Sequence, residues 1–134
     1  MALSDHDIQE IQQLQALYGH AVDWPDQSLP PKVFTEDAIF DGRLAGPDSY
    51  HEGLPAISAW FGLGKPPHPK VHHVMNVWVY EHDGQVRVKS KWLVKSQIDG
   101  DVYLGDYDDV VVKTADGWRI KIRVVIARDP GLMS

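Results

Sequence analysis

The sequence predicts an α+β fold, because helix-like and strand-like segments occupy different parts of the chain. In the N-terminal part, apolar residues recur at the spacing of a helix that buries one face. In the C-terminal part, apolar runs rich in β-formers are separated by Asp-Gly pairs, which are the strongest short signal for a hairpin. Helices followed by an antiparallel meander predict a layered domain in which helices cover one face of the sheet.

The first helix is predicted from about Asp5 to Asp23. Ser4, followed by Asp7 at the third position, has the spacing of a capping box. Trp24-Pro25 ends the helix, because proline disfavours helical geometry in the residue before it. The buried stripe of this helix consists of Ile8, Ile11, Leu14, Leu17, Tyr18, Ala21 and Val22.

Shorter elements are predicted between this helix and the meander. Leu29–Phe34 has prolines at its start and predicts a short helix. Ala38–Asp41 predicts a short strand, and Gly42–Ser49 a loop. Gly53–Phe61 predicts a helix, and the Gly- and Pro-rich stretch Gly62–Pro69 a second loop.

Four long strands are predicted in the second half, over Val71–Tyr80, Val86–Ile98, Val102–Thr114 and Trp118–Arg128. A long, twisted sheet with helices across one face leaves a concave cavity, which is where small ligands bind. The last strand is apolar on both faces at Val124, Val125 and Ile126. Its apolar outer face predicts a homodimer interface or packing by the C-terminal tail.

Length and composition narrow the class of protein. A chain of 134 residues predicts a single domain over 1–134. The net charge of −6 at pH 7, without a basic cluster, argues against a nucleic-acid partner. The absence of cysteine excludes disulfides and thiolate chemistry. No apolar run has the length of a membrane span, so we expect a cytoplasmic protein without a membrane partner.

Two residues could form a proton-transferring pair. Asp23 ends an apolar helical stripe, where a poorly solvated carboxylate would suit a general base; the alternative is a surface or capping aspartate. In a strand, His72 and His73 point to opposite faces, so at most one faces the cavity. If His72 lies near Asp23, the two form a dyad in which the carboxylate fixes the imidazole tautomer. A lone structural histidine is the alternative.

Aromatic residues are abundant on the predicted inner surfaces. Core packing explains many of them, but Tyr18 and Tyr107 carry phenols that could polarise a substrate carbonyl. The predicted walls of a substrate pocket contain Phe40, Tyr50, Trp60, Trp92 and Tyr107. The acidic cluster at 106, 108 and 109 lacks calcium-loop spacing, and no phosphate-binding or GxSxG motif occurs. We therefore expect neither a metal nor another cofactor.

The chain resembles the SnoaL-like branch of the nuclear transport factor 2-like superfamily, which includes scytalone dehydratase, bile acid 7α-dehydratase and hexachlorocyclohexane dehydrochlorinase. The resemblance runs from about Ile8 to Arg128. It rests on the spacing of Ile11, Leu14, Tyr18, Asp23, Phe34, Asp37, Ala38, His51, Glu52, Gly53, Ala56, Ile57, Trp60, Phe61, His72, His73, Val74, Asn76, Gly105, Asp109, Asp116, Gly117, Trp118, Arg119, Ile120 and Arg123.

The resemblance implies a cone, in which a strongly bent sheet wraps around long helices and leaves a pocket at the wide end. It also implies that Asp23 and His72 form a catalytic dyad and that Tyr18 contributes to catalysis. The expected activity is a cofactor-independent lyase or isomerase, in the manner of a dehydratase, acting on a hydrophobic and cyclic small molecule. A polyketide-cyclase-like enzyme and a non-catalytic binding or assembly module are the alternatives, because fold alone does not give function.

Overall fold

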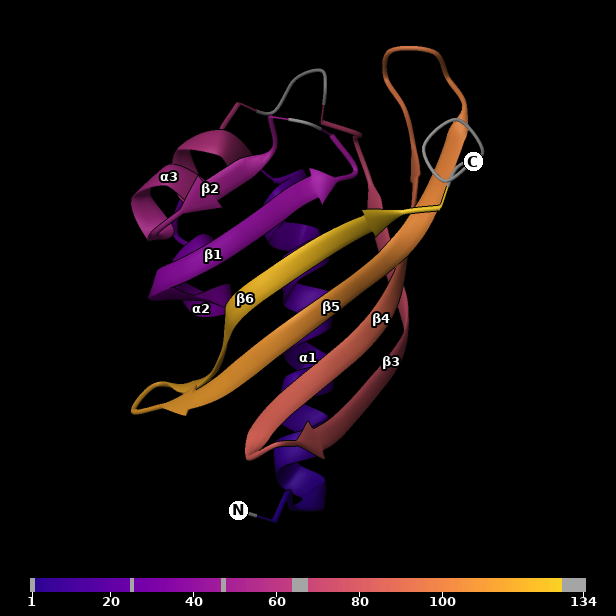
Figure 1. Ribbon diagram of the computed structural model, residues 1–134. Helices are drawn as coiled ribbons and strands as arrows, with labels where there is room; N and C mark the ends of the chain where they lie inside the picture. Colours follow the sequence, from indigo (N-terminus) through magenta and orange to yellow (C-terminus); the bar gives the residue numbers. More distant parts are fainter. Residues whose placement is uncertain (1, 25, 47, 64–67, 129–134) are drawn as a thin grey trace.

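A six-stranded mixed sheet curves around one long helix in the computed structural model of the protein (Figure 1). The structure describes residues 2–24, 26–46, 48–63 and 68–128. Its elements are α1 (Asp5–Asp23), α2 (Pro30–Val33), β1 (Phe34–Leu44), β2 (Tyr50–Glu52), α3 (Leu54–Phe61), β3 (His72–His82), β4 (Gln85–Lys95), β5 (Val102–Thr114) and β6 (Gly117–Ala127). In the described residues, none of these helices combines the length and apolar character needed to cross a membrane.

The strand order is β2-β1-β6-β5-β4-β3. The antiparallel meander from β3 to β6 confirms the prediction from the Asp-Gly turns. At the other end of the sheet, β1 pairs in parallel with β6 and antiparallel with β2. The α+β class with a curved, mixed sheet packed on helices is therefore confirmed, and β1 and β2 extend the predicted meander to six strands.

The first half of the chain contains more strand than we predicted. β1 extends the predicted Ala38–Asp41 strand at both ends, so Phe34 begins a strand instead of ending a helix, and Gly42 belongs to the strand. Pairing with β6 stabilises these added residues, and that neighbour is about eighty residues away in the chain. β2 was not predicted, because three residues are too few to show a periodic pattern. Residues 64–67 of the predicted 62–69 loop lie outside the described residues.

Helix α1 lies against the concave face of the sheet and contacts both β3 and β6 (Figure 1). Its apolar stripe packs with α2, α3 and the inner face of the strands in one core, which includes Ile11, Val33, Phe34, Ile57, Val88 and Ile120. A register shift in β3 between Met75 and Trp78, where Asn76 has a φ of 56°, bends that edge of the sheet. The bend helps to keep the sheet curved around the helix.

The start of α1 is fixed to the far end of the sheet through Asp7. The Asp7 carboxylate accepts hydrogen bonds from the Ser4 backbone N–H (3.1 Å) and from the Trp118 indole N–H (3.1 Å). The Ser4 hydroxyl in turn accepts one from the Asp7 backbone N–H, which completes the predicted capping box. The Ser4 backbone N–H and the Trp118 indole hold the pKa of Asp7 well below its ordinary value of 3.8.

We expect Asp7→Asn to lower the free energy of unfolding at neutral pH and to have less effect in acid. The stability from the lowered pKa of Asp7 is complete above the unfolded value near 3.8, and it is lost as pH falls through the folded value. Urea unfolding between pH 7 and pH 2 measures this difference. Asp5→Asn in the same helical turn is the control, since Asp5 is exposed. A deficit that stays constant down to pH 2 would contradict the linkage.

Candidate functional site

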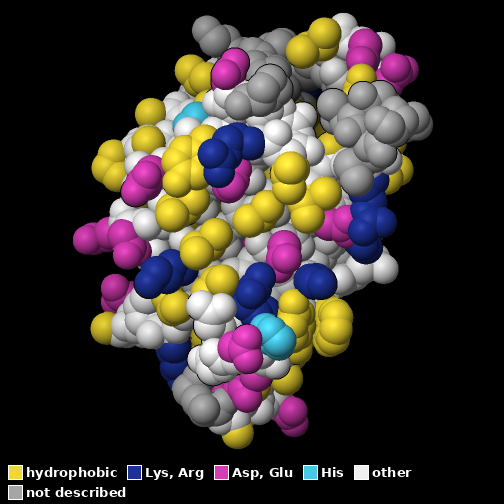
Figure 2. All heavy atoms as spheres, viewed as in Figure 1, with side chains coloured by type: hydrophobic (Ala, Val, Ile, Leu, Met, Phe, Trp, Pro, Cys, Tyr) yellow, Lys and Arg dark blue, Asp and Glu magenta, His cyan; other side chains and the backbone are white. Residues whose placement is uncertain are grey.

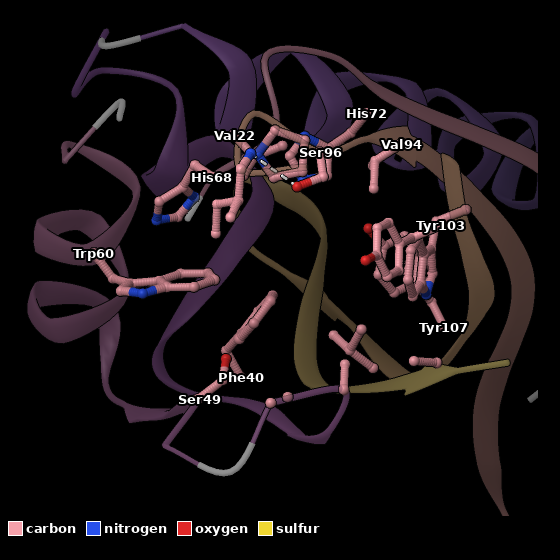
Figure 3. A pocket seen from close by; sticks show the side chains of 18 of the residues that line it. Val22, Phe40, Ser49, Trp60, His68, His72, Val94, Ser96, Tyr103 and Tyr107 are labelled. Carbon is pink, nitrogen blue, oxygen red and sulfur yellow. Dashed lines mark hydrogen bonds between the residues drawn. The ribbon is translucent and has the colours of Figure 1, made fainter. Parts of the chain in front are cut away.

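A cavity of about 370 Å³ lies between the C-terminal end of α1, helix α3 and the inner face of the sheet (Figure 3). This volume lies in the range of small-molecule sites. Its walls are largely apolar and include the aromatic residues Tyr18, Phe40, Trp60, Trp92, Tyr103 and Tyr107. His72 and His68 also line the cavity and bring ionisable groups to its apolar surface.

Asp23 and His72 are hydrogen-bonded at the edge of this cavity. The ring nitrogen Nδ1 of His72 lies 2.7 Å from Oδ1 of Asp23. The backbone N–H of His72 also donates to the same carboxylate, with its nitrogen 3.1 Å from Oδ1 and 3.0 Å from Oδ2. The side chain of Asp23 is 16% exposed, and that of His72 is 11% exposed. The carboxylate is therefore held at both the backbone and the ring of His72.

The local sequence explains how Asp23 reaches His72. Asp23 is the last residue of α1, and the extended Trp24 follows it. Gly19 lies one turn earlier, where an added Cβ would come within 3.2 Å of the His72 carbonyl oxygen. The absence of a side chain at Gly19 therefore lets the helix approach the start of β3 closely. A carboxylate at a helix C-terminus is unfavourable beside the helix dipole, and the N–H groups of His72 offset that cost.

This geometry defines which nitrogen of His72 can handle a proton. A carboxylate accepts hydrogen bonds, so Nδ1 carries the hydrogen that it donates to Asp23. The neutral ring then has its lone pair at Nε2, and His72 lines the cavity. Protonation at Nε2 would produce an imidazolium beside a carboxylate, which stabilises it. The arrangement is suited to taking a proton from a bound molecule and returning it.

Two phenols form the adjacent wall of the cavity. Tyr18 and Tyr107 are both almost fully buried, and their rings meet edge to face with centroids 5.3 Å apart. Burial raises the pKa of both phenols, most strongly that of Tyr107. Both groups therefore stay protonated at neutral pH and can act as hydrogen-bond donors.

A buried ion pair supports the two tyrosines from behind. The Arg123 guanidinium lies 4.0 Å from the ring centroids of both Tyr18 and Tyr107. It also forms a two-point ion pair with Asp109, with Nε–Oδ1 and Nη2–Oδ2 distances of 2.8 and 2.7 Å, and it donates to Gln15. Burial would lower the pKa of Arg123, but the Asp109 carboxylate outweighs it and raises the pKa. Arg123 therefore remains charged, although its side chain is 0% exposed.

Comparison with known proteins gives the family. The SnoaL-like domain family matches residues 5–124. The chain belongs to this family. A relative at 33% identity is the uncharacterised protein Rv2910c of Mycobacterium tuberculosis (strain H37Rv), in a match covering 86% of this chain and 81% of the relative.

Solved structures also show the fold that the SnoaL-like family implies. The Kfla4162 protein from Kribbella flavida superposes with a TM-score of 0.80 at 21% identity, covering 93% of both chains. A protein from Novosphingobium aromaticivorans named as a candidate aromatic ring hydroxylase gives 0.75 at 26% identity, covering 96% of this chain and 94% of that one. Another from this organism, named as a candidate scytalone dehydratase, gives 0.68 at 19% identity and covers 91% and 84%.

The structure brings most of the predicted site residues of this SnoaL-like chain to one cavity. Tyr18, His72 and the predicted walls Phe40, Trp60, Trp92 and Tyr107 all line it. Asp23 lies behind His72. Tyr50 does not line the cavity. It pairs with Asp41 of β1, and the Arg43 guanidinium lies over its ring, so Tyr50 stays at the surface and is 39% exposed. We therefore leave Tyr50 out of the site.

Sequence reasoning missed three parts of the site. His68 follows a Gly- and Pro-rich stretch without periodicity, and Tyr103 is the second residue of β5, next to a loop. The Arg123–Asp109 pair was also missed, although a signal for it exists. Arg123 interrupts an apolar strand run, and such a cation requires a buried partner. Asp109 is directly opposite it in the β5–β6 register.

The acidic residues of β5 are each paired with a cation. Asp106 contacts Lys91 and Arg128, while Asp108 pairs with Arg87 at 3.0 Å. Asp109 pairs with Arg123, as described above. Within the described ranges, no group of three or more histidine, aspartate or glutamate side chains is placed to hold a metal. The cluster serves ion pairing across the strands.

Proposed function

We propose that this protein is a cofactor-independent lyase or isomerase that removes a proton from carbon in a hydrophobic cyclic molecule, in the manner of a dehydratase. The observation that carries the proposal is the hydrogen bond between Asp23 and His72 at the wall of an apolar cavity. A proton-transferring base needs a fixed tautomer and access to the substrate, and this geometry supports both. The likeness to the candidate scytalone dehydratase concerns the fold alone.

In the proposed elimination, Nε2 of His72 takes the proton from a carbon beside a carbonyl group. The electron pair of the broken C–H bond forms a C=C bond, and the hydroxyl on the next carbon leaves. The departing hydroxyl takes up the proton held on Nε2 of His72 and leaves as water, so His72 returns to its neutral form. Asp23 keeps Nδ1 protonated and stabilises the imidazolium. In an isomerisation, the same proton returns to a different carbon.

The phenols of Tyr18 and Tyr107 are the proposed donors to the carbonyl oxygen. Both line the cavity and stay protonated because burial raises the pKa of each. Donors fixed in a dry site stabilise the negative charge that develops as the proton leaves. The Arg123–Asp109 pair behind the rings holds them in place.

The walls favour a neutral aromatic or alicyclic substrate. Phe40, Trp60 and Trp92 give the cavity flat apolar surfaces. Among the lining residues that the structure describes, none is lysine or arginine, so a carboxylate or phosphate would lack a counter-charge. We therefore propose a bicyclic hydroxyketone as a representative substrate class.

The test uses a bicyclic β-hydroxyketone such as a 3-hydroxytetralone, which loses water to give a fluorescent naphthol. We expect wild-type protein to accelerate the appearance of naphthol fluorescence. The matching tetralone without the hydroxyl, incubated in D₂O, reports proton abstraction alone through exchange beside the carbonyl. Exchange without elimination would favour an isomerase. Binding of both compounds with neither reaction would favour a ligand-binding module and contradict the proposal.

We further propose that the outer face of the sheet joins two copies of the chain. Figure 2 shows hydrophobic side chains across the middle of this face, flanked by charged ones. The half-buried Val124 and Ile126 on β6 lie beside acidic Asp106 and Asp108 on β5, and β4 presents a basic row next to them. If two such faces packed antiparallel, the acidic residues of one copy would lie opposite the basic row of the other. Sedimentation should give a dimer that Val124→Lys dissociates; a monomeric wild type would contradict the proposal.

A further inference from the structure

His68 is a buried imidazole at the cavity wall that the proposed proton transfer does not use. It follows the residues 64–67 that precede β3, and it is only 4% exposed. Its ring packs on Trp60 with centroids 4.2 Å apart, and its backbone carbonyl accepts a hydrogen bond from the Gln97 side chain. Its Nε2 atom is buried and has no hydrogen-bond partner in the part of the chain that the structure describes.

The surroundings define the hydrogen-bonding character of this ring. Burial lowers the pKa of His68, and the nearby rings of His72 and His51 lower it further, so the imidazole is neutral at pH 7. A neutral imidazole has a hydrogen on one nitrogen and a lone pair on the other, so Nε2 can accept a hydrogen bond in the tautomer with the hydrogen on Nδ1. A buried acceptor without a donor is unfavourable until a ligand supplies one.

The cavity places His68 where a bound molecule could reach it. In Figure 3, His68 and Trp60 lie on one side of the cavity, and Tyr103 and Tyr107 lie on the opposite side. His72 lies between these two sides. A flat molecule that contacts the tyrosines with one end and His72 with its middle would present its other end to Trp60 and His68.

We propose that Nε2 of His68 accepts a hydrogen bond from a ligand hydroxyl, and that His68 thereby selects hydroxylated aromatic ligands. This role rests on the proposed function, because it assigns a second contact in the same cavity. Because Nε2 is buried, the His68 ring would have to turn toward the cavity for this contact to form. A site built around a hydroxyl rejects analogues that lack it, because its buried polar group is then left without a partner.

The chain offers a matched control for this residue. His51 stacks on the same Trp60 with centroids 4.7 Å apart, and burial lowers its pKa as well. Its Nε2 is also buried without a partner among the described residues. Unlike His68, His51 is absent from the cavity lining. Replacing each histidine by phenylalanine separates a contact with the ligand from stacking on Trp60.

The experiment titrates a naphthol and its methyl ether into wild type, His68→Phe and His51→Phe by calorimetry. We expect wild-type protein to prefer the naphthol, and His68→Phe to lose about tenfold in naphthol affinity, the loss of one hydrogen bond. The affinity of His68→Phe for the ether should be unchanged, and His51→Phe should match wild type for both ligands. His68→Gln, which keeps an acceptor, should recover part of the naphthol preference. Circular dichroism checks that each variant is folded.

Two results would overturn the proposal. One is an unchanged naphthol preference in His68→Phe. The other is an equal loss for naphthol and ether, which would make His68 a packing residue of the wall. Because the titration measures binding alone, it gives the same answer whether or not the protein eliminates water. Failure of the catalytic proposal is therefore distinguishable from failure of this one.

Discussion

His72→Ala is expected to reduce the elimination rate by about a hundredfold to ten-thousandfold, the usual contribution of a general base. The variant loses the Nε2 lone pair and leaves the Asp23 carboxylate without its ring partner. The backbone N–H of residue 72 still donates to that carboxylate, so the end of α1 should stay in place. The naphthol assay described above measures the rate, and ligand titration should show that the cavity still binds.

The adjacent histidine is the control for this variant. His73 is exposed and points to the opposite face of β3, so His73→Ala should leave the rate unchanged. Asp23→Asn should also slow the reaction, because the amide no longer fixes the imidazole tautomer or stabilises the imidazolium. If His72→Ala remained active, the Asp23–His72 dyad would not be part of the mechanism, and the tyrosines would become the candidate catalytic residues.

Asp109→Asn is expected to lower the free energy of unfolding by about 3–5 kcal/mol, because it leaves the charge of Arg123 buried without a counter-ion. Both side chains of this pair are fully buried, and Arg123 also contacts the rings of Tyr18 and Tyr107. The loss should therefore weaken ligand binding along with stability. Urea unfolding monitored by tryptophan fluorescence measures the first effect.

The neighbouring residue on the same strand is the control. Asp108 pairs with Arg87 across β4 and β5 on the solvent side, and both side chains are partly exposed. Asp108→Asn should cost about 1 kcal/mol or less, as solvent-screened pairs do. Equal effects at the two adjacent positions would show that Arg123 finds another partner or that water enters the site. Replacing Asp109 and Arg123 together by apolar residues should recover part of the loss.

The sequence predicts the local features of this fold better than its distant pairings. The limits of α1 follow from Ser4 and Trp24-Pro25, and the meander follows from three Asp-Gly turns, because both signals are local. The parallel pairing of β1 with β6 depends on the whole topology, and no turn residue in the sequence indicates it. For the same reason, the full length of β1 was missed.

In the candidate site too, features set by local sequence could be predicted, and features set by distant contacts could not. The periodicity of α1 brings Tyr18 and Asp23 to its buried side and its end, and strand alternation limits the choice between His72 and His73. The hydrogen bond between Asp23 and His72 depends on how closely the helix approaches β3, which Gly19 allows. His68 could not be predicted, since its position depends on the path of an aperiodic segment.

The pairing of β1 with β6 has a consequence for how the protein is made. On a ribosome the chain emerges from its N-terminus, so β1 is available long before the strand beside which it must lie. Until then, the apolar stripe of α1 has only a partial sheet to cover, and Arg123 cannot reach Gln15 and Asp109. The last hairpin thus completes both the sheet and the floor of the cavity. A nascent chain stalled before β6 should remain open to protease and to chaperones, and the cavity should form only after release.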